Sequence, residues 1–286
     1  MKPLLKWTAL ALAVCLPLSA QAHRAWMLPS ATVLSGEDPW VTVDAAVSND
    51  LFYFEHFPMR LQGIGEINEA AKGPARPAAQ LQVFAPNGEL VQPQNGSMGR
   101  YRSTFDVNLK EKGTYKLAIA NNGIFARWKE NGENKRWMGS PAEFSKAVPK
   151  NAQDLSVTDS SSRMEVFVTS GEPTDTVLQT TGKGLELKAV THPNDLFAEE
   201  TATFVLLLDG KPASHVDVSV IPGGNRYRDN TGEIKTKSND KGEINITWPT
   251  AGMYWLEAET TSQENVTAPA TQRRATYSAT LEVLPQ

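Results

Sequence analysis

Cysteine is almost absent from this sequence. Its single cysteine, Cys15, lies in an apolar segment near the start, so a chain that loses this segment has no disulfide and no thiolate metal ligand. The fold must then be stabilised by its hydrophobic core, and 286 residues are enough for one large or two medium cores. Long apolar runs are also lacking after residue 23, so we expect no membrane insertion.

The common signatures of catalysis and of nucleic-acid binding are missing as well. There is no His-Glu-x-x-His, no Cys-x-x-Cys, no Gly-x-Ser-x-Gly and no acidic calcium loop. The formal net charge is -4, which disfavours a nucleic-acid partner. We therefore assign no catalytic residues and predict that the protein is not an enzyme.

Residues 1–22 have the organisation of a secretory signal peptide. Lys2 and Lys6 form a positively charged start, an apolar stretch follows, and Ala-Gln-Ala at residues 20–22 matches a small-x-small cleavage site. Cleavage after residue 22 makes His23 the first residue of the mature chain. We predict a periplasmic protein exported by this signal.

An N-terminal histidine is a metal chelate formed by one residue. The α-amino nitrogen and a ring nitrogen of His23 can bind the same cation, since both lose protons at modest cost near neutral pH. His56, at the end of an aromatic strand predicted over residues 51–57, is a candidate second ligand. His192, with Asp195 nearby, is a third candidate. Nitrogen ligands without thiolate suit nickel, cobalt, copper or zinc.

Each of these features also has an interpretation without a ligand. His23 can be an inert exposed terminus, and His56 a packed, hydrogen-bonded residue at a strand end; His215 is predicted to be structural. Residues 125–138 contain two basic and aromatic runs around an Asn-Gly pair, which predicts a β-hairpin. Its two tryptophans form either a docking surface for a partner or cross-strand packing.

Short runs with alternating apolar residues, bounded by Gly, Pro, Asn and Asp, predict an all-β protein. We expect two antiparallel β-sandwich domains of immunoglobulin-like or prealbumin-like type. The first covers residues 23–169, with long loops over residues 60–79 and 139–162, and the second covers residues 184–286. Residues 170–183 are the predicted linker. A single sheet that runs continuously through the linker would contradict this division.

Several segments of the chain resemble the DUF4198 family of Gram-negative periplasmic proteins. They are His-Arg-Ala-Trp-Met-Leu-Pro-Ser at residues 23–30, Trp-Val-Thr-Val-Asp-Ala-Ala at 40–46, Ser-Asn-Asp-Leu-Phe-Tyr-Phe at 48–54, and residues 242–257 with Trp-Pro and Gly-Met-Tyr-Trp-Leu. The resemblance implies an accessory metal-binding protein related to nickel or cobalt uptake. It also implies a histidine directly after the signal peptide, which is His23 here.

Three functions remain open at this point. The first is a periplasmic protein that binds nickel, cobalt or copper and delivers it to a membrane transporter or receptor. The second is a copper mono-oxygenase-like enzyme with a histidine brace, in which Tyr53 is the axial aromatic residue. The third is an immunoglobulin-like scaffold without a ligand, for which we expect His23 to be buried or disordered.

Overall fold

The computed structural model describes residues 23–65 and 78–286. The predicted signal peptide and part of the long loop predicted over residues 60–79 lie outside the described residues. Within the described ranges no helix is both long and apolar enough to span a bilayer. The helical segments of these ranges are short: η1 (Pro141–Glu143), α1 (Phe144–Ala147), η2 (Thr176–Leu178) and η3 (Asn225–Tyr227).

Three β-sheets make up the described chain, which confirms the predicted all-β class. The five-stranded sheet contains β1 (Arg24–Pro29), β3 (Trp40–Ser48), β8 (Ser103–Asn108) and β7 (Gln94–Met98) in that order, with β4 (Phe57–Pro58) paired to β3. The four-stranded sheet contains β12 (Leu185–Ala189), β13 (Thr201–Leu208) and β14 (Lys211–Pro212), with β17 (Glu243–Thr247) paired to β13.

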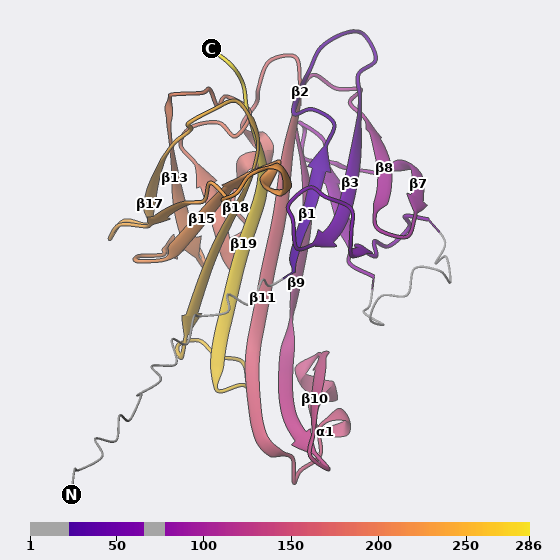
Figure 1. Ribbon diagram of the computed structural model, residues 1–286, viewed down its shortest axis with the longest axis vertical. Helices are drawn as coiled ribbons and strands as arrows, with labels where there is room; N and C mark the ends of the chain where they lie inside the picture. The colour runs from indigo at the N-terminus through magenta and orange to yellow at the C-terminus, as the bar shows by residue number, and fades with distance from the viewer. Residues whose placement is uncertain (1–22, 66–77) are drawn as a thin grey trace, which may run out of the picture.

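The third sheet has ten strands and forms the centre of the molecule (Figure 1). Its order is β16 (Ile234–Lys237), β15 (Asp217–Pro222), β18 (Gly252–Ser262), β19 (Gln272–Val283), β11 (Gln153–Ser170), β9 (Gly113–Glu130), β5 (Leu81–Phe84) and β6 (Leu90–Val91). Two further strands are attached to it, β10 (Glu133–Gly139) to β9 and β2 (Val33–Leu34) to β11.

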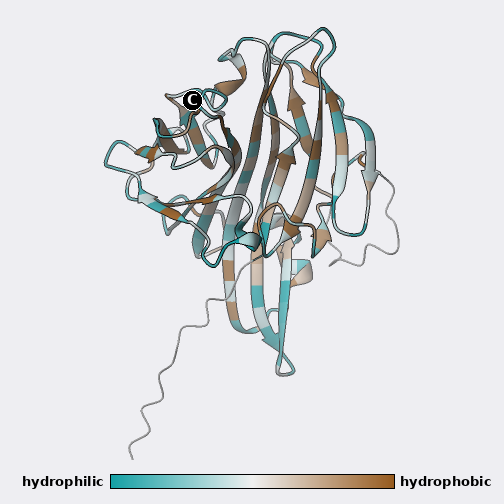
Figure 2. Ribbon diagram, turned by 45° about the horizontal axis from the view of Figure 1, so that its top comes forward, coloured by the Kyte–Doolittle hydropathy of each residue, from teal (hydrophilic) through white to brown (hydrophobic). Residues whose placement is uncertain are grey.

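Two hydrophobic cores lie between these sheets. The first fills the space between the five-stranded sheet and one half of the ten-stranded sheet, around Phe105, Leu117 and Val166. The second lies between the four-stranded sheet and the other half, around Phe204 and Trp248. The strands of both halves carry long hydrophobic stretches where they face these cores (Figure 2). The molecule is therefore a double β-sandwich.

The two sandwiches are joined by a shared sheet, which the sequence did not lead us to expect. Strand β19, from the C-terminal half, runs parallel to β11, from the N-terminal half, with Thr158 opposite Gln272 and Val166 opposite Thr280. Without β19, the long strand β11 would present an unpaired edge. Residues 171–184 contain η2 and no strand, as the predicted linker requires. The expectation that the sheets also separate there is wrong, and the domain division itself stays a prediction.

A buried polar network crosses this junction. Glu165, in β11, lies 3.2 Å from the guanidinium of Arg163 and accepts a 3.0 Å hydrogen bond from the hydroxyl of Tyr277, in β19. Glu186, in β12, lies 3.5 Å from Arg163 and accepts hydrogen bonds from the backbone of Thr181 and Gly182. Burial raises the pKa of Tyr277 well above its ordinary value, so the phenol stays protonated and donates.

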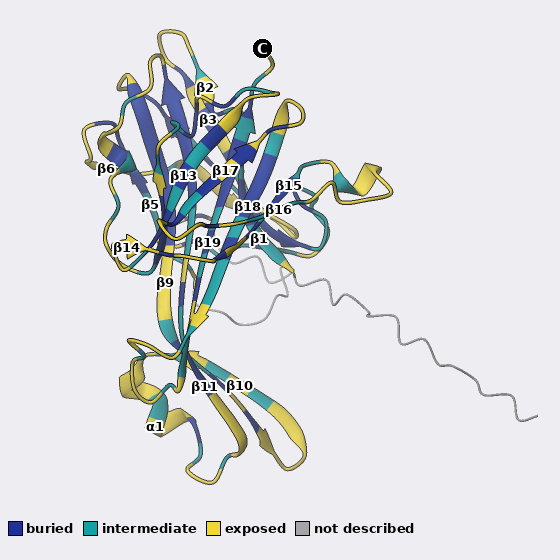
Figure 3. Cartoon of the chain, turned by 90° about the vertical axis from the view of Figure 1, so that its left-hand side faces the viewer, coloured by how far each residue is buried: buried dark blue, intermediate teal, exposed yellow. Residues whose placement is uncertain are grey.

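The hairpin predicted over residues 125–138 is confirmed, and it belongs to an arm that projects from the sandwiches (Figures 1 and 3). Glu130 pairs with Glu133 across Asn131 and Gly132, both of which have positive φ, as a type I′ turn requires. Residues 153–162, expected to lie in a loop, instead form the outer half of β11, which pairs with β9 along the arm.

The tryptophans of the arm pack inside it. Trp128 is 8% exposed and contacts Ala126 and Val148, while Trp137 meets the ring of Phe144 edge-on at 5.9 Å. This arrangement agrees with the packing interpretation of the hairpin. These contacts pack the two indole rings against neighbouring side chains and do not form a docking surface of projecting rings.

Candidate metal site

Strand register fixes the position of His23. β1 runs antiparallel to β3 with Arg24 opposite Ser48, so one further step places His23 opposite Asn49. The side chains meet there: Nδ1 of His23 lies 2.8 Å from Oδ1 of Asn49. Met27 pairs with Ala45 in the same ladder, so β1 holds the residues that follow His23 against β3. A free amine at His23 requires cleavage after Ala22, which lies outside the described residues.

The aromatic segment before His56 is a loop, so the strand predicted over residues 51–57 is wrong except for its last residue. Phe52 has φ 59, in the left-handed region, which a strand does not tolerate. Phe52 and Phe54 instead pack against Trp26, each with a ring-centroid distance of 5.5 Å. Burial of these rings over Trp26 therefore determines the path of the loop.

A carboxylate holds this loop closed. Oε1 of Glu55 accepts hydrogen bonds from the backbone nitrogens of Asn49, at 2.8 Å, and Asp50, at 3.3 Å. Beyond the loop, Phe57 in β4 pairs with Val47 in β3. His56 is thereby placed beside the end of β3, on the side opposite to β1.

His23 and His56 meet over the end of β3. Their ring centroids are 3.9 Å apart, with an angle of 32° between the ring planes. Both residues are exposed, so a cation can reach them. Two imidazole nitrogens bound to one ion each lie ~2 Å from it, hence at most ~4 Å apart. The 3.9 Å contact is measured between ring centroids and brings the two residues within reach of one ion; rotation of the side chains would direct one nitrogen of each ring toward it, with the free amine of His23 as the third donor.

The aromatic neighbour of this pair is Phe57, not Tyr53. The Phe57 ring lies 4.5 Å from that of His56 and 6.2 Å from that of His23. The guanidinium of Arg226 lies 4.0 Å above the ring of Tyr53, so Tyr53 belongs to the contact with the second sandwich. Sequence reasoning missed Phe57, although it directly follows His56, and it missed Asn49.

The structure does not bring His192 to the other two histidines. Nε2 of His192 lies 3.1 Å from Oγ1 of Thr114, and Nδ1 accepts a 3.0 Å hydrogen bond from the backbone of Asn194. The described residues contain no group of three or more His, Cys, Asp or Glu side chains arranged to hold a metal. His192 thus joins the two halves of the chain, and His215 lies apart, 3.1 Å from Asp240.

The burial of His192 predicts a loss of stability in acid. Burial lowers the pKa of its imidazole below the ordinary value of 6.5, an effect that Asp175 and Asp195 partly oppose. Below about pH 6.5 the unfolded chain binds a proton that the folded chain still excludes, so the free energy of unfolding falls. Urea denaturation at about pH 7.5 and about pH 5.5, on either side of the ordinary pKa of histidine, measures the free energy of unfolding. The decrease in this free energy between the two pH values should be smaller for His192→Gln than for the wild type. An equal fall would contradict the prediction.

The fold and the candidate site together define a double β-sandwich protein with a histidine pair at one end of its N-terminal sheet. The chain belongs to the DUF4198 family, described as a domain of unknown function, whose family model matches residues 20–262. This match contains both histidines of the pair. No curated protein matches the chain.

Three solved structures are similar to the chain at a distance. The D0-D1 domain of intimin is 11% identical to this chain, with a TM-score of 0.19. The alignment covers 90% of this chain and 97% of the intimin chain. Dimeric latent PorU from Porphyromonas gingivalis is 12% identical over 93% of this chain and 21% of its own, with a TM-score of 0.20. A marsupial T cell receptor is 10% identical over 92% and 73%, with a TM-score of 0.19.

Proposed function

We propose that the protein binds one nickel, cobalt or copper ion in the periplasm through His23 and His56 and delivers it to a membrane transporter or receptor. The observation that carries this proposal is the 3.9 Å contact between the ring of the predicted first residue of the mature chain and a second exposed histidine ring. The amine and a ring nitrogen of His23 and a ring nitrogen of His56 supply three neutral donors of the kind these ions favour.

The exposure of the pair supports a carrier role. An ion held by two exposed side chains and a chain terminus can enter and leave without unfolding of a core, whereas structural metal sites are closed by four protein ligands. The anchoring of β1 on β3 supports preorganisation, since a terminus tied into a sheet loses little further freedom when it binds. These features oppose a scaffold without a ligand, for which His23 should be buried or disordered.

A copper histidine-brace enzyme is the second candidate. Phe57 favours it, because an aromatic ring beside an N-terminal histidine and a second histidine is the environment expected for an axial aromatic residue. Consumption of oxygen by the copper-loaded mature protein that depends on added reductant would support the enzyme. A redox-inactive complex would support the carrier.

Calorimetric titration of a chain that begins at His23 tests the metal site. We expect one Ni(II), Co(II) or Cu(II) ion per chain and an affinity lower by at least tenfold in His56→Ala and in His56→Phe. His56→Phe retains an aromatic ring against Phe57, so a lower affinity of this variant for the metal reports the missing nitrogen. His215→Ala is the matched control and should bind like the wild type, since His215 lies apart, paired with Asp240. Equal affinity in all four proteins would overturn the proposal.

A further inference from the structure

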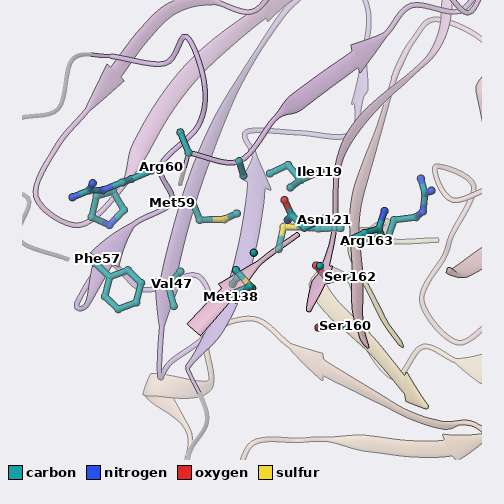
Figure 4. A pocket seen from close by; sticks show the side chains of 18 of the residues that line it. Val47, Phe57, Met59, Arg60, Ile119, Asn121, Met138, Ser160, Ser162 and Arg163 are labelled. Carbon is teal, nitrogen blue, oxygen red and sulfur yellow. The ribbon is translucent and has the colours of Figure 1, made fainter. Parts of the chain in front are cut away.

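A cavity of about 580 Å³ lies beside the histidine pair, within the range of small-molecule binding sites (Figure 4). Val47, Phe57 and Met59, from and next to β3 and β4, form one wall. The inner face of the β9 and β11 arm forms the opposite wall, with Ile119 and Asn121 among its residues. The space is thus bounded by the N-terminal sheet on one side and by the base of the arm on the other.

The lining has the chemistry of a site for an organic molecule. It is mainly apolar, it contains no carboxylate, Arg60 and Arg163 border it, and so do three of the chain's seven methionines: Met59, Met138 and Met164. Met138 is 56% exposed, so it lines an opening and does not fill a core. Flexible, polarisable methionine side chains adapt to ligands of varied shape. A bare hard cation would find no charged oxygen ligand in this space.

A small set of polar groups is available on the arm wall. Asn121 is opposite Ser162 in the β9 and β11 ladder, and Ser160 is opposite Gly123, so these side chains share one face. The described residues give the side chains of Asn121, Ser160 and Ser162 no hydrogen-bond partner. They can therefore bind polar atoms of a ligand without breaking existing hydrogen bonds.

The cavity adjoins the histidine pair at Phe57, although neither histidine is among the residues that line it. Phe57 lines the cavity and contacts both histidine rings, and Ala25, two residues after His23, lines it as well. His23 and His56 offer an ion three nitrogens, and the described residues contain no group of three or more His, Cys, Asp or Glu side chains arranged to hold a metal. Tetragonal Cu(II) or Ni(II) needs at least one more ligand. Water or an organic molecule can supply that ligand, and the adjoining cavity favours an organic molecule.

We propose that the cavity binds a small organic chelator that carries the metal, so that the cargo is a metal–chelator complex. The chelator's nitrogen or oxygen donors complete the coordination of the ion at His23 and His56. Its apolar body contacts Met59, Ile119 and Met164, and its polar substituents bind Asn121, Ser160 and Ser162. This inference rests on the proposed metal site and names the form in which the ion is bound.

The test compares three probes on the chain that begins at His23: Ni(II) alone, 2,2′-bipyridine alone, and their equimolar complex, which joins an apolar aromatic body to an ion with open positions. We expect the complex to bind at least tenfold more tightly than Ni(II) alone. Ser162→Phe, which fills the cavity from β11, should abolish this gain and leave the affinity for Ni(II) alone within about twofold. Ser156→Phe places the same side chain on β11 outside the cavity and should behave like the wild type.

The outcomes separate the two proposals. If Ni(II) alone binds with the expected dependence on His56, but bipyridine adds no affinity or Ser162→Phe retains the gain, the metal site stands and the chelator site is overturned. If Ni(II) alone binds equally well to His56→Ala, the metal site fails. Binding of bipyridine alone that is lost in Ser162→Phe would then identify the cavity as a site for an organic ligand without a metal, which also overturns the composite site.

Discussion

A single glycine added before His23 is expected to lower the affinity of the mature protein for Ni(II) and Cu(II) by at least ten- to hundredfold, the cost of disturbing a metal's ligand environment. The extension converts the α-amine of His23 into a peptide nitrogen, which no longer offers a lone pair to a cation at neutral pH. The chelate then loses one of its three donors, while the rings of His23 and His56 remain. Competition titration against a chelating dye measures the change.

The control for this experiment is a glycine added after Gln286, which changes the length of the chain equally and leaves the amine of His23 free. Thermal melts of both extended proteins should match the mature form, because His23 precedes the β1 and β3 ladder and is not part of it. If the N-terminally extended protein binds both ions as tightly as the mature form, the amine is not a ligand. The carrier proposal would then lose its central donor.

Glu165→Ala is expected to lower the free energy of unfolding by about 3 kcal/mol, the lower end of the cost of breaking a buried ion pair, because Arg163 keeps Glu186 as a second partner. Glu165 is 5% exposed, and its carboxylate contacts both Arg163 and the hydroxyl of Tyr277. Burial lowers the pKa of Lys116, and the attraction between Glu165 and the ammonium of Lys116 opposes this effect. Removal of this carboxylate leaves these groups buried where β9, β11 and β19 meet. Urea denaturation measures the loss.

Two variants show whether this loss comes from the buried charge. Tyr277→Phe removes one hydrogen bond and keeps the ion pair, so we expect a smaller cost, about 1–3 kcal/mol. Glu259→Ala makes the same side-chain change in a pair with Arg274 whose side chains are 40% and 50% exposed, and exposed pairs contribute about 0–1 kcal/mol. If Glu165→Ala costs no more than Glu259→Ala, the network does not stabilise the shared sheet.

Local pattern was sufficient for several features of the fold. Val41, Val43 and Ala45 alternate with polar residues in the sequence and are fully buried in β3. The Asn-Gly pair at residues 131 and 132 forms the predicted hairpin turn. These features depend on residues close together in the chain, because side-chain alternation and turn geometry are set within a few residues. The family resemblance, too, could be recognised from short segments.

The aromatic loop shows where local pattern fails. Alternating aromatic residues at 52 and 54 satisfy the period of a strand, but both rings pack on Trp26, from another strand, and the backbone at Phe52 turns into the left-handed region. The gain from burying two aromatic rings outweighs a strand preference that spans only about 1 kcal/mol. A sequence window that does not include Trp26 cannot contain this information.

The sequence by itself determined the all-β class, strands with clear alternation such as β3, the hairpin and the candidate role of His23, because each follows from local periodicity, turn chemistry or position in the chain. Only the tertiary structure decided that His56 lies against His23, that His192 does not, and that β19 joins the two sandwiches through β11. These contacts arise from register and packing between strands far apart in sequence. Such pairings depend on which faces and edges can be buried together in the whole molecule, and no local segment specifies them.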